Sequence, residues 1–157
     1  MDSKIDLYGP LWVYFSLNVW IAIFGKLLTY GDVLHVHKLY KCYLVFAAYF
    51  FLIPLALSIL FCLLSTNGYP GYAKLLAIYG YSFTVYIPAV ALYLIPDEYA
   101  RWTILGVAGV ISLFWICKEL IGTIVNNFET WKVIFFAILQ CLLHAGFTYL
   151  LKYYFFA

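Results

Sequence analysis

Residues 75–95 read LLAIYGYSFTVYIPAVALYLI and contain no charged side chain. A helix needs about 20 mainly apolar residues to cross the hydrocarbon core of a bilayer. Only a helix or a closed barrel satisfies its own backbone hydrogen bonds there, and a barrel strand is shorter and alternates apolar with polar residues. This stretch does not alternate, so it predicts a transmembrane helix.

Four other apolar runs resemble this one in length. The short connections between the runs are rich in turn residues, and we expect the longest of them, residues 26–42, to be a loop. The pattern predicts an all-α polytopic membrane protein with one domain over residues 1–157, a bundle of five transmembrane helices. An odd number of spans places the two ends of the chain on opposite sides of the membrane. The five runs are 11–28, 43–64, 75–95, 102–117 and 133–154.

The composition agrees with a protein whose partner is the lipid bilayer. Hydrophobic residues make up 67% of the chain and charged residues 10%, whereas a soluble domain has about 45–50% and about 25%. The net charge of +2 is too small to indicate a nucleic-acid partner, and no basic stripe supports one. The Lys and Arg residues divide almost evenly between the two predicted sides, so the positive-inside rule does not orient the bundle.

No residue pattern indicates an enzyme, a cofactor or a metal site. The chain has no GxSxG or HExxH motif and no paired acids at one depth, and its four cysteines form no CxxC pair. His35, His37 and Asp32 share the 26–42 connection, but two histidines and one acid are a weak metal signal. We therefore predict a non-enzymatic protein without a cofactor.

Two ionisable residues inside the apolar runs are weaker functional candidates. His144 lies midway along the fifth run, one turn after Gln140, and a histidine inside a membrane is a functional candidate by default. A hydrogen bond to another helix explains it equally well. Lys26 ends the first run, where its ammonium can reach the interface.

The third run carries a polar and aromatic stripe. Tyr72, Tyr79, Tyr86 and Tyr93 recur every seven residues, and Ser82 falls between them at helical spacing. A phenol hydroxyl in hydrocarbon needs a partner, so the stripe is predicted to face other helices. Either it packs a central helix, or it forms a seam that a ligand or partner helix uses. Two prolines should distort their helices, Pro54 in the second run and Pro88 in the third.

The first run opens with DLYGP, residues 6–10. Pro10 suits a first helical position, and Asp6 could accept hydrogen bonds from the free amides of that helix end. The motif is therefore either a well-formed helix start or a binding motif.

Together, DLYGPLW at the first run and YGYSFTVYIP in the third resemble the Yip family of Rab-interacting Golgi and ER membrane proteins. The resemblance is to the branch with DLYGPFW and YGYSLF-YIP at these places. LIPLAL in the second run and the Arg101–Trp102 pair also resemble that branch. The motif residues, which become candidates for partner binding, are Asp6, Leu7, Tyr8, Gly9, Pro10, Tyr79, Gly80, Tyr81, Ser82, Tyr86, Ile87 and Pro88.

The resemblance implies a non-enzymatic role in vesicle traffic between ER and Golgi or within the Golgi. It implies a Rab GTPase or another five-span protein as partner, a cytosolic N-terminus and a lumenal C-terminus. Family members carry a long polar cytosolic segment before DLYGP, and here residues 1–5 precede it. We therefore expect that either the function needs only the membrane bundle, or the chain is a fragment or reduced form. The alternative function is a small membrane carrier or lipid-handling protein that uses the tyrosine seam.

Overall fold

The computed structural model describes residues 5–28, 33–64, 70–92, 94–126 and 128–154, and their side chains except those between 25 and 39. The described residues form helices and contain no strand. The elements are α1 (Tyr8–Leu28), α2 (Val33–Ala47), a π-helical turn η1 (Ala48–Leu52), α3 (Ile53–Leu64), α4 (Tyr72–Ser82), a 3-10 turn η2 (Phe83–Val85), α5 (Tyr86–Leu92), α6 (Glu98–Ile124) and α7 (Thr130–Tyr154).

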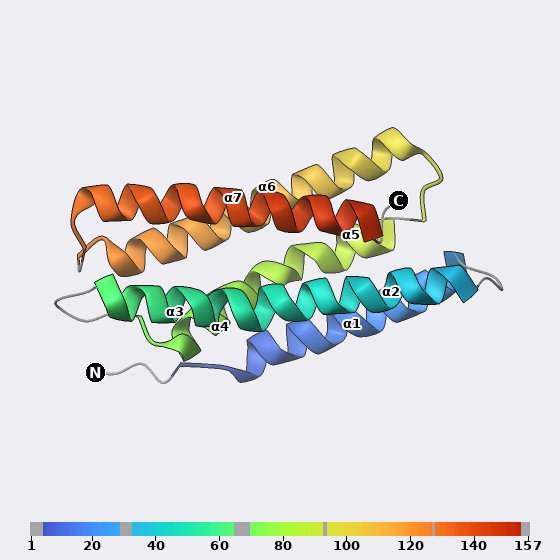
Figure 1. The fold of residues 1–157 in the computed structure, drawn as a ribbon. Helices are drawn as coiled ribbons and strands as arrows, with labels where there is room; N and C mark the ends of the chain where they lie inside the picture. Colours follow the sequence, from blue (N-terminus) through green and yellow to red (C-terminus); the bar gives the residue numbers. More distant parts are fainter. Residues whose placement is uncertain (1–4, 29–32, 65–69, 93, 127, 155–157) are drawn as a thin grey trace.

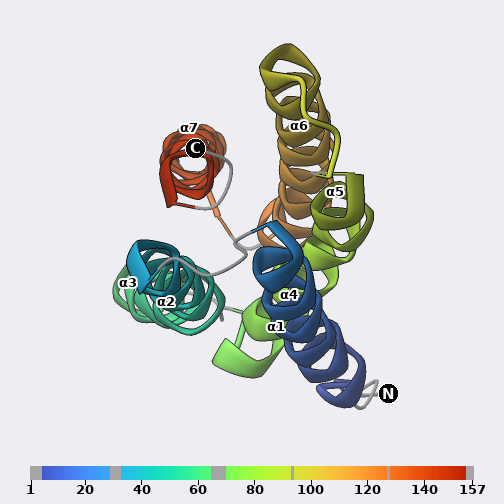
Figure 2. The same ribbon diagram turned by 90° about the vertical axis from the view of Figure 1, so that its right-hand side faces the viewer.

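The described helices form an elongated bundle of antiparallel passes (Figure 1). Helix α1 runs one way, α2 to α3 return, α4 to α5 run forward, α6 returns and α7 runs forward again. The start of α1 and the end of α7 therefore lie at opposite ends of the bundle, as the sequence predicts. The pass of α4 and α5 contacts both α1 and α6, and Figure 2 shows it between them.

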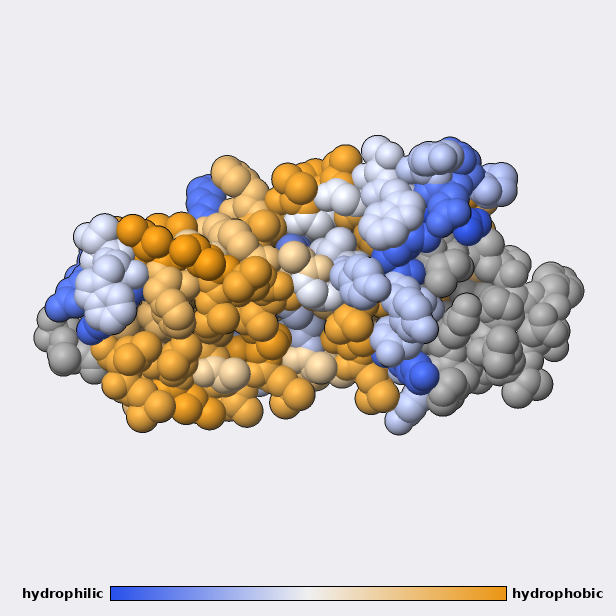
Figure 3. Space-filling model, turned by 45° about the horizontal axis from the view of Figure 1, so that its top comes forward, coloured by the Kyte–Doolittle hydropathy of each residue, from blue (hydrophilic) through white to orange (hydrophobic). Residues whose placement is uncertain are grey.

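In the described part of the chain, four segments are long and apolar enough to cross a membrane, and Tyr8–Phe24 is a shorter apolar helix. Apolar side chains cover much of the surface in Figure 3, and hydrophilic residues gather toward its ends. These features confirm the all-α polytopic membrane fold. The four long segments are Tyr40–Leu64, Tyr72–Leu92, Glu98–Ile124 and Thr130–Tyr154.

Two helices extend beyond the limits drawn from hydropathy. The connection 26–42 is not a loop throughout, because α2 begins at Val33. The fourth run, predicted over 102–117, extends at both ends as α6. Asp97 caps the start of α6 by accepting a hydrogen bond from the Ala100 amide at 3.1 Å. A charged turn ends an apolar run but not a helix, so hydropathy locates the apolar run and misses the helical turns beyond it.

The two predicted proline distortions are present, and each has its own form. The turn before Pro54 is π-helical, with the Ile53 amide donating to the Ala48 carbonyl. The turn before Pro88 is a 3-10 helix between α4 and α5. A proline removes one amide donor and crowds the preceding turn, and short π or 3-10 turns absorb such a change. The π turn brings both Tyr49 and Phe50 into the core.

Candidate functional site

The two motifs on which the family resemblance rests meet in space. One carboxylate oxygen of Asp6 accepts hydrogen bonds from the amides of Tyr8 at 2.9 Å and Gly9 at 3.4 Å. The other oxygen accepts a hydrogen bond from the Tyr81 hydroxyl at 2.9 Å. Because Asp6 caps the Tyr8 amide, α1 begins two residues before Pro10, the residue predicted at its first position. Asp6 thus starts α1 and ties it to α4.

Two glycines let α1 and α4 approach closely at this point. A Cβ on Gly80 would lie 2.5 Å from the Pro10 Cβ and 2.9 Å from the Phe50 ring. A Cβ on Gly9 would lie 2.4 Å from the Tyr81 hydroxyl. Each motif therefore supplies a glycine that accommodates the other motif, which explains why small residues stand at both positions.

The DLYGP motif has a packed part and an exposed part. Pro10 is buried, and Leu7 packs against the core. Asp6 is exposed, and Tyr8 is 72% exposed, with its ring edge against Trp12. The packed part has a structural role, and the exposed part leaves its side chains available to a partner.

The tyrosine stripe of the third run faces other helices, as predicted. Tyr79, Ser82 and Tyr86 are almost fully buried, and the Ser82 hydroxyl donates to the Tyr79 carbonyl at 2.7 Å. Tyr72 is partly buried, and Tyr93 lies outside the described residues. Of the other motif residues in this pass, Ile87 packs against the core and Pro88 is exposed.

His144 on α7 joins three helical passes through its ring. Its Nε2 lies 3.0 Å from the Gly109 carbonyl on α6, so we assign the proton to Nε2, which donates there. Nδ1 then accepts a hydrogen bond from the Tyr49 hydroxyl at 2.6 Å. The Tyr86 hydroxyl lies 3.3 Å from Nε2. A buried imidazole with partners at both nitrogens is well satisfied.

Gln140, one turn earlier on α7, extends this cluster. Its amide nitrogen donates to the Tyr49 hydroxyl at 3.1 Å, and its carbonyl oxygen accepts from the Tyr79 hydroxyl. Tyr49, Tyr79, Tyr86, Gln140 and His144 form what we call the polar core. Its members are neutral hydroxyl, amide and imidazole groups that hydrogen-bond to one another, an arrangement suited to helix association in a membrane.

Comparison with known proteins agrees with the two motifs. A curated protein of Dictyostelium discoideum, named Protein YIPF1 homolog, is 29% identical to this chain over 97% of it. This similarity supports the relationship to the Yip family that the two motifs indicate. The chain spans 45% of that relative's own length. No family model matches the chain, and no solved structure matches it.

The contact between the two motifs gives a pH prediction. The hydrogen bond from Tyr81, and then the Tyr8 amide, lower the pKa of Asp6 below its ordinary value. A carboxyl whose pKa is lower in the folded state stabilises the fold above its unfolded pKa, and that contribution is lost as the pH falls through the folded pKa. We expect Tyr81→Phe to raise the Asp6 pKa, measured by carbon-13 NMR titration of labelled aspartate. An Asp6 pKa equal in the two proteins would contradict the contact.

The structure does not place the remaining candidates, Lys26 and the possible metal ligands, in a site. Lys26 lies in α1, but its side chain is outside the described part of the chain, as are Asp32 and the side chains of His35 and His37. No group of three potential metal ligands occurs among the described residues. The sequence analysis missed Tyr49, whose only local signal is its position five residues before Pro54. Its partner His144 is 95 residues away, so no spacing rule connects them.

Proposed function

We propose that the chain is the membrane-embedded part of a Yip-type trafficking protein. In this proposal it acts without catalysis as an adaptor or organiser in transport between ER and Golgi or within the Golgi. Its N-terminus faces the cytosol and its C-terminus the lumen. The similarity to the Yip relative supports the general role. The hydrogen bond between Asp6 and Tyr81 supports the choice of partner-binding residues, because it joins the two motifs in space.

The proposed docking surface is the exposed start of α1. It consists of Asp6, Tyr8 and Trp12, which are exposed, together with Tyr81, which is 38% exposed and hydrogen-bonded to Asp6. Tyrosine and tryptophan supply much of the binding energy at protein interfaces, and the Asp6–Tyr81 bond holds Tyr81 beside the start of α1. The proposed partner is a Rab GTPase or another five-span membrane protein.

The carrier alternative gains no comparable support. A pathway along the tyrosine seam would need polar groups that can be reached by a solute. Tyr79 and Tyr86 have 0% exposure, and their hydroxyls lie against Gln140 and His144. These contacts favour the packing interpretation of the stripe over a transport interpretation.

The proposal predicts that Tyr8→Ala loses its partner without loss of folding. Tyr8 is 72% exposed, and truncating an aromatic anchor of an interface commonly costs about 2 kcal/mol or more, which is at least about tenfold in affinity. The measurement is quantitative mass spectrometry of proteins that co-purify with the tagged chain from gently solubilised native membranes. Gel filtration of the same samples reports folding.

Tyr99→Ala is the matched control, because Tyr99 is 84% exposed and lies in α6 at the other end of the bundle. It should retain the partner that Tyr8→Ala loses. Equal recovery of a Rab or a five-span protein with both variants would reject the docking surface. Recovery of neither partner with the unmodified chain would reject the adaptor function for these residues.

A further inference from the structure

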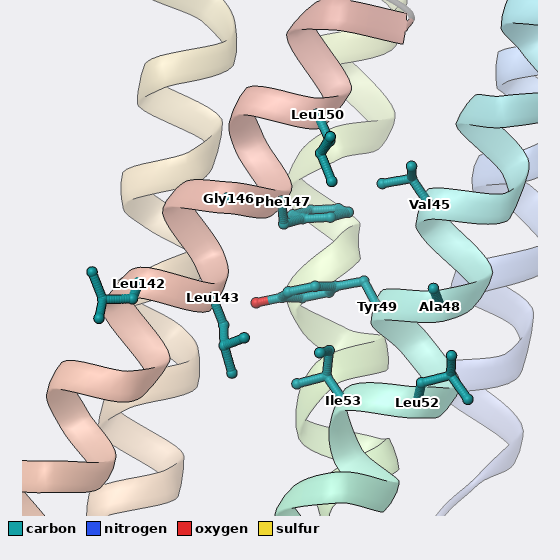
Figure 4. A pocket seen from close by; sticks show the side chains of 10 residues that line it. All are labelled: Val45, Ala48, Tyr49, Leu52, Ile53, Leu142, Leu143, Gly146, Phe147 and Leu150. Atoms are coloured by element: carbon teal, nitrogen blue, oxygen red, sulfur yellow. The ribbon is translucent and has the colours of Figure 1, made fainter.

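A groove of about 370 Å³ lies between the second pass and α7. Figure 4 shows side chains of α2, η1 and α3 on one wall and of α7 on the other. Its volume falls in the range of small-molecule sites, about 300–1,000 Å³. A Cβ on Gly146, in the α7 wall, would have no neighbour within 4 Å. The lining residues are Val45, Ala48, Tyr49, Leu52, Ile53, Leu142, Leu143, Gly146, Phe147 and Leu150.

The groove is apolar inside and open toward the lipid. Leu52, Leu142 and Leu150 on its rim are 59%, 67% and 40% exposed. Its floor is the Tyr49 ring stacked on Phe147, with centroids 4.0 Å apart. The Tyr49 hydroxyl is already bonded within the polar core. The groove therefore fits a hydrocarbon chain and provides no free hydrogen-bonding group for a polar ligand.

One end of the groove carries a positive charge. Lys41 lies one turn before Val45 on α2, and Tyr154 lies one turn after Leu150 on α7. The Lys41 ammonium is 5.6 Å from the centroid of the Tyr154 ring, so it crosses from one wall to the other at the groove's end. Among the described residues, ion pairs with acids engage Lys132 and Lys152, not Lys41.

A second groove on the other side of α7 provides a comparison. It measures about 330 Å³ and is lined by Gly106 and Trp102 of α6. The lysine at its Trp102 end is Lys152, whose ammonium is 5.2 Å from the Trp102 ring centroid and 3.7 Å from the Glu98 carboxylate. The two grooves are similar in size, but only the groove beside Lys41 has a cation without an acid within ion-pair distance among the described residues.

We propose that the groove beside Lys41 binds one acyl chain of an anionic glycerophospholipid, whose phosphate lies on the Lys41 ammonium. The groove supplies the contact with the chain, and Lys41 supplies the preference for negative charge. Tyr154 holds the lysine at the interface through its ring face. This proposal is independent of the trafficking function.

The test is native mass spectrometry of the detergent-purified, delipidated chain titrated with dioleoyl phosphatidylserine or dioleoyl phosphatidylcholine. We expect the unmodified chain to retain one phosphatidylserine more strongly than phosphatidylcholine. Lys41→Gln should reduce that preference about fivefold, the effect of one lysine at a charged membrane surface. Gly146→Leu should abolish retention, because its side chain occupies the groove.

Gly106→Leu is the matched control, since a Cβ at Gly106 also has no neighbour within 4 Å and the residue lines the second groove. It should retain phosphatidylserine as the unmodified chain does. Equal retention by the two leucine variants, or no preference for phosphatidylserine in the unmodified chain, would overturn the proposal. A change of oligomeric state with Gly146→Leu alone, without a change in lipid retention, would overturn it in favour of a second copy in the groove.

Discussion

The His144→Ala variant is expected to lose about 3 kcal/mol of unfolding free energy, because a buried side chain and its hydrogen bonds are removed together. His144 contacts Tyr49, Tyr86 and the Gly109 carbonyl, and it is 2% exposed. Its removal leaves a cavity and deprives the Tyr49 hydroxyl of its acceptor. The measurement is unfolding of the purified protein in bicelles by steric trapping.

Leu142→Ala on the same helix is the control. Leu142 is 67% exposed to the membrane side, so lipid fills the space that the side chain leaves, and the change should stay within about 0.5 kcal/mol. A second variant, Gln140→Leu, should also destabilise the bundle, since it leaves the Tyr79 hydroxyl without its acceptor. If His144→Ala costs no more than Leu142→Ala, the polar core does not hold α7 to the bundle.

The Gly80→Ala variant is expected to destabilise the protein by about 1–3 kcal/mol through overpacking. The added Cβ would lie 2.5 Å from the Pro10 Cβ and 3.0 Å from its Cα. The blocking atoms include backbone, so α1 must move away from α4 to make room. The same unfolding measurement reports the loss, and a cross-link between cysteines placed on α1 and α4 would report the separation.

Variants of two other glycines serve as controls for this prediction. Gly106→Ala should be neutral or slightly stabilising, because alanine favours a helix and nothing lies within 4 Å of its Cβ. Gly9→Ala should cost less than Gly80→Ala, because the Tyr81 hydroxyl it meets is the end of a side chain that can rotate away. That rotation would break the Asp6–Tyr81 bond. A Gly80→Ala protein as stable as Gly106→Ala would contradict the close packing of the two motifs.

Much of the architecture follows from local properties of the chain. Uncharged apolar runs require helices in a bilayer, so the all-α fold and its antiparallel passes could be predicted. The seven-residue spacing of Tyr79 and Tyr86 was enough to predict that both side chains face other helices, where they are buried. Pro54 and Pro88 marked both irregular turns, although which turn would be π and which 3-10 depends on the packing around them.

The candidate site could be predicted only in its parts. DLYGP and YGYS were each recognisable, but their contact joins residues 75 positions apart. Tyr49 was missed because its hydrogen bond to His144 spans 95 positions. The start of α2 and the full length of α6 were missed because hydropathy locates apolar runs, and these helices continue past the ends of their runs.

The sequence by itself determined that this chain is a membrane protein and that its passes are helical. It also determined which residues form the two motifs that resemble those of the Yip family. Hydropathy, periodicity and proline position are local properties, and the bilayer enforces them one helix at a time. Only the tertiary structure decided that Asp6 hydrogen-bonds to Tyr81 and that Pro10 packs against Gly80. It also decided that His144 hydrogen-bonds to residues of other helices in the polar core. These contacts depend on which helices become neighbours, and close packing and buried hydrogen bonds between distant residues select that arrangement.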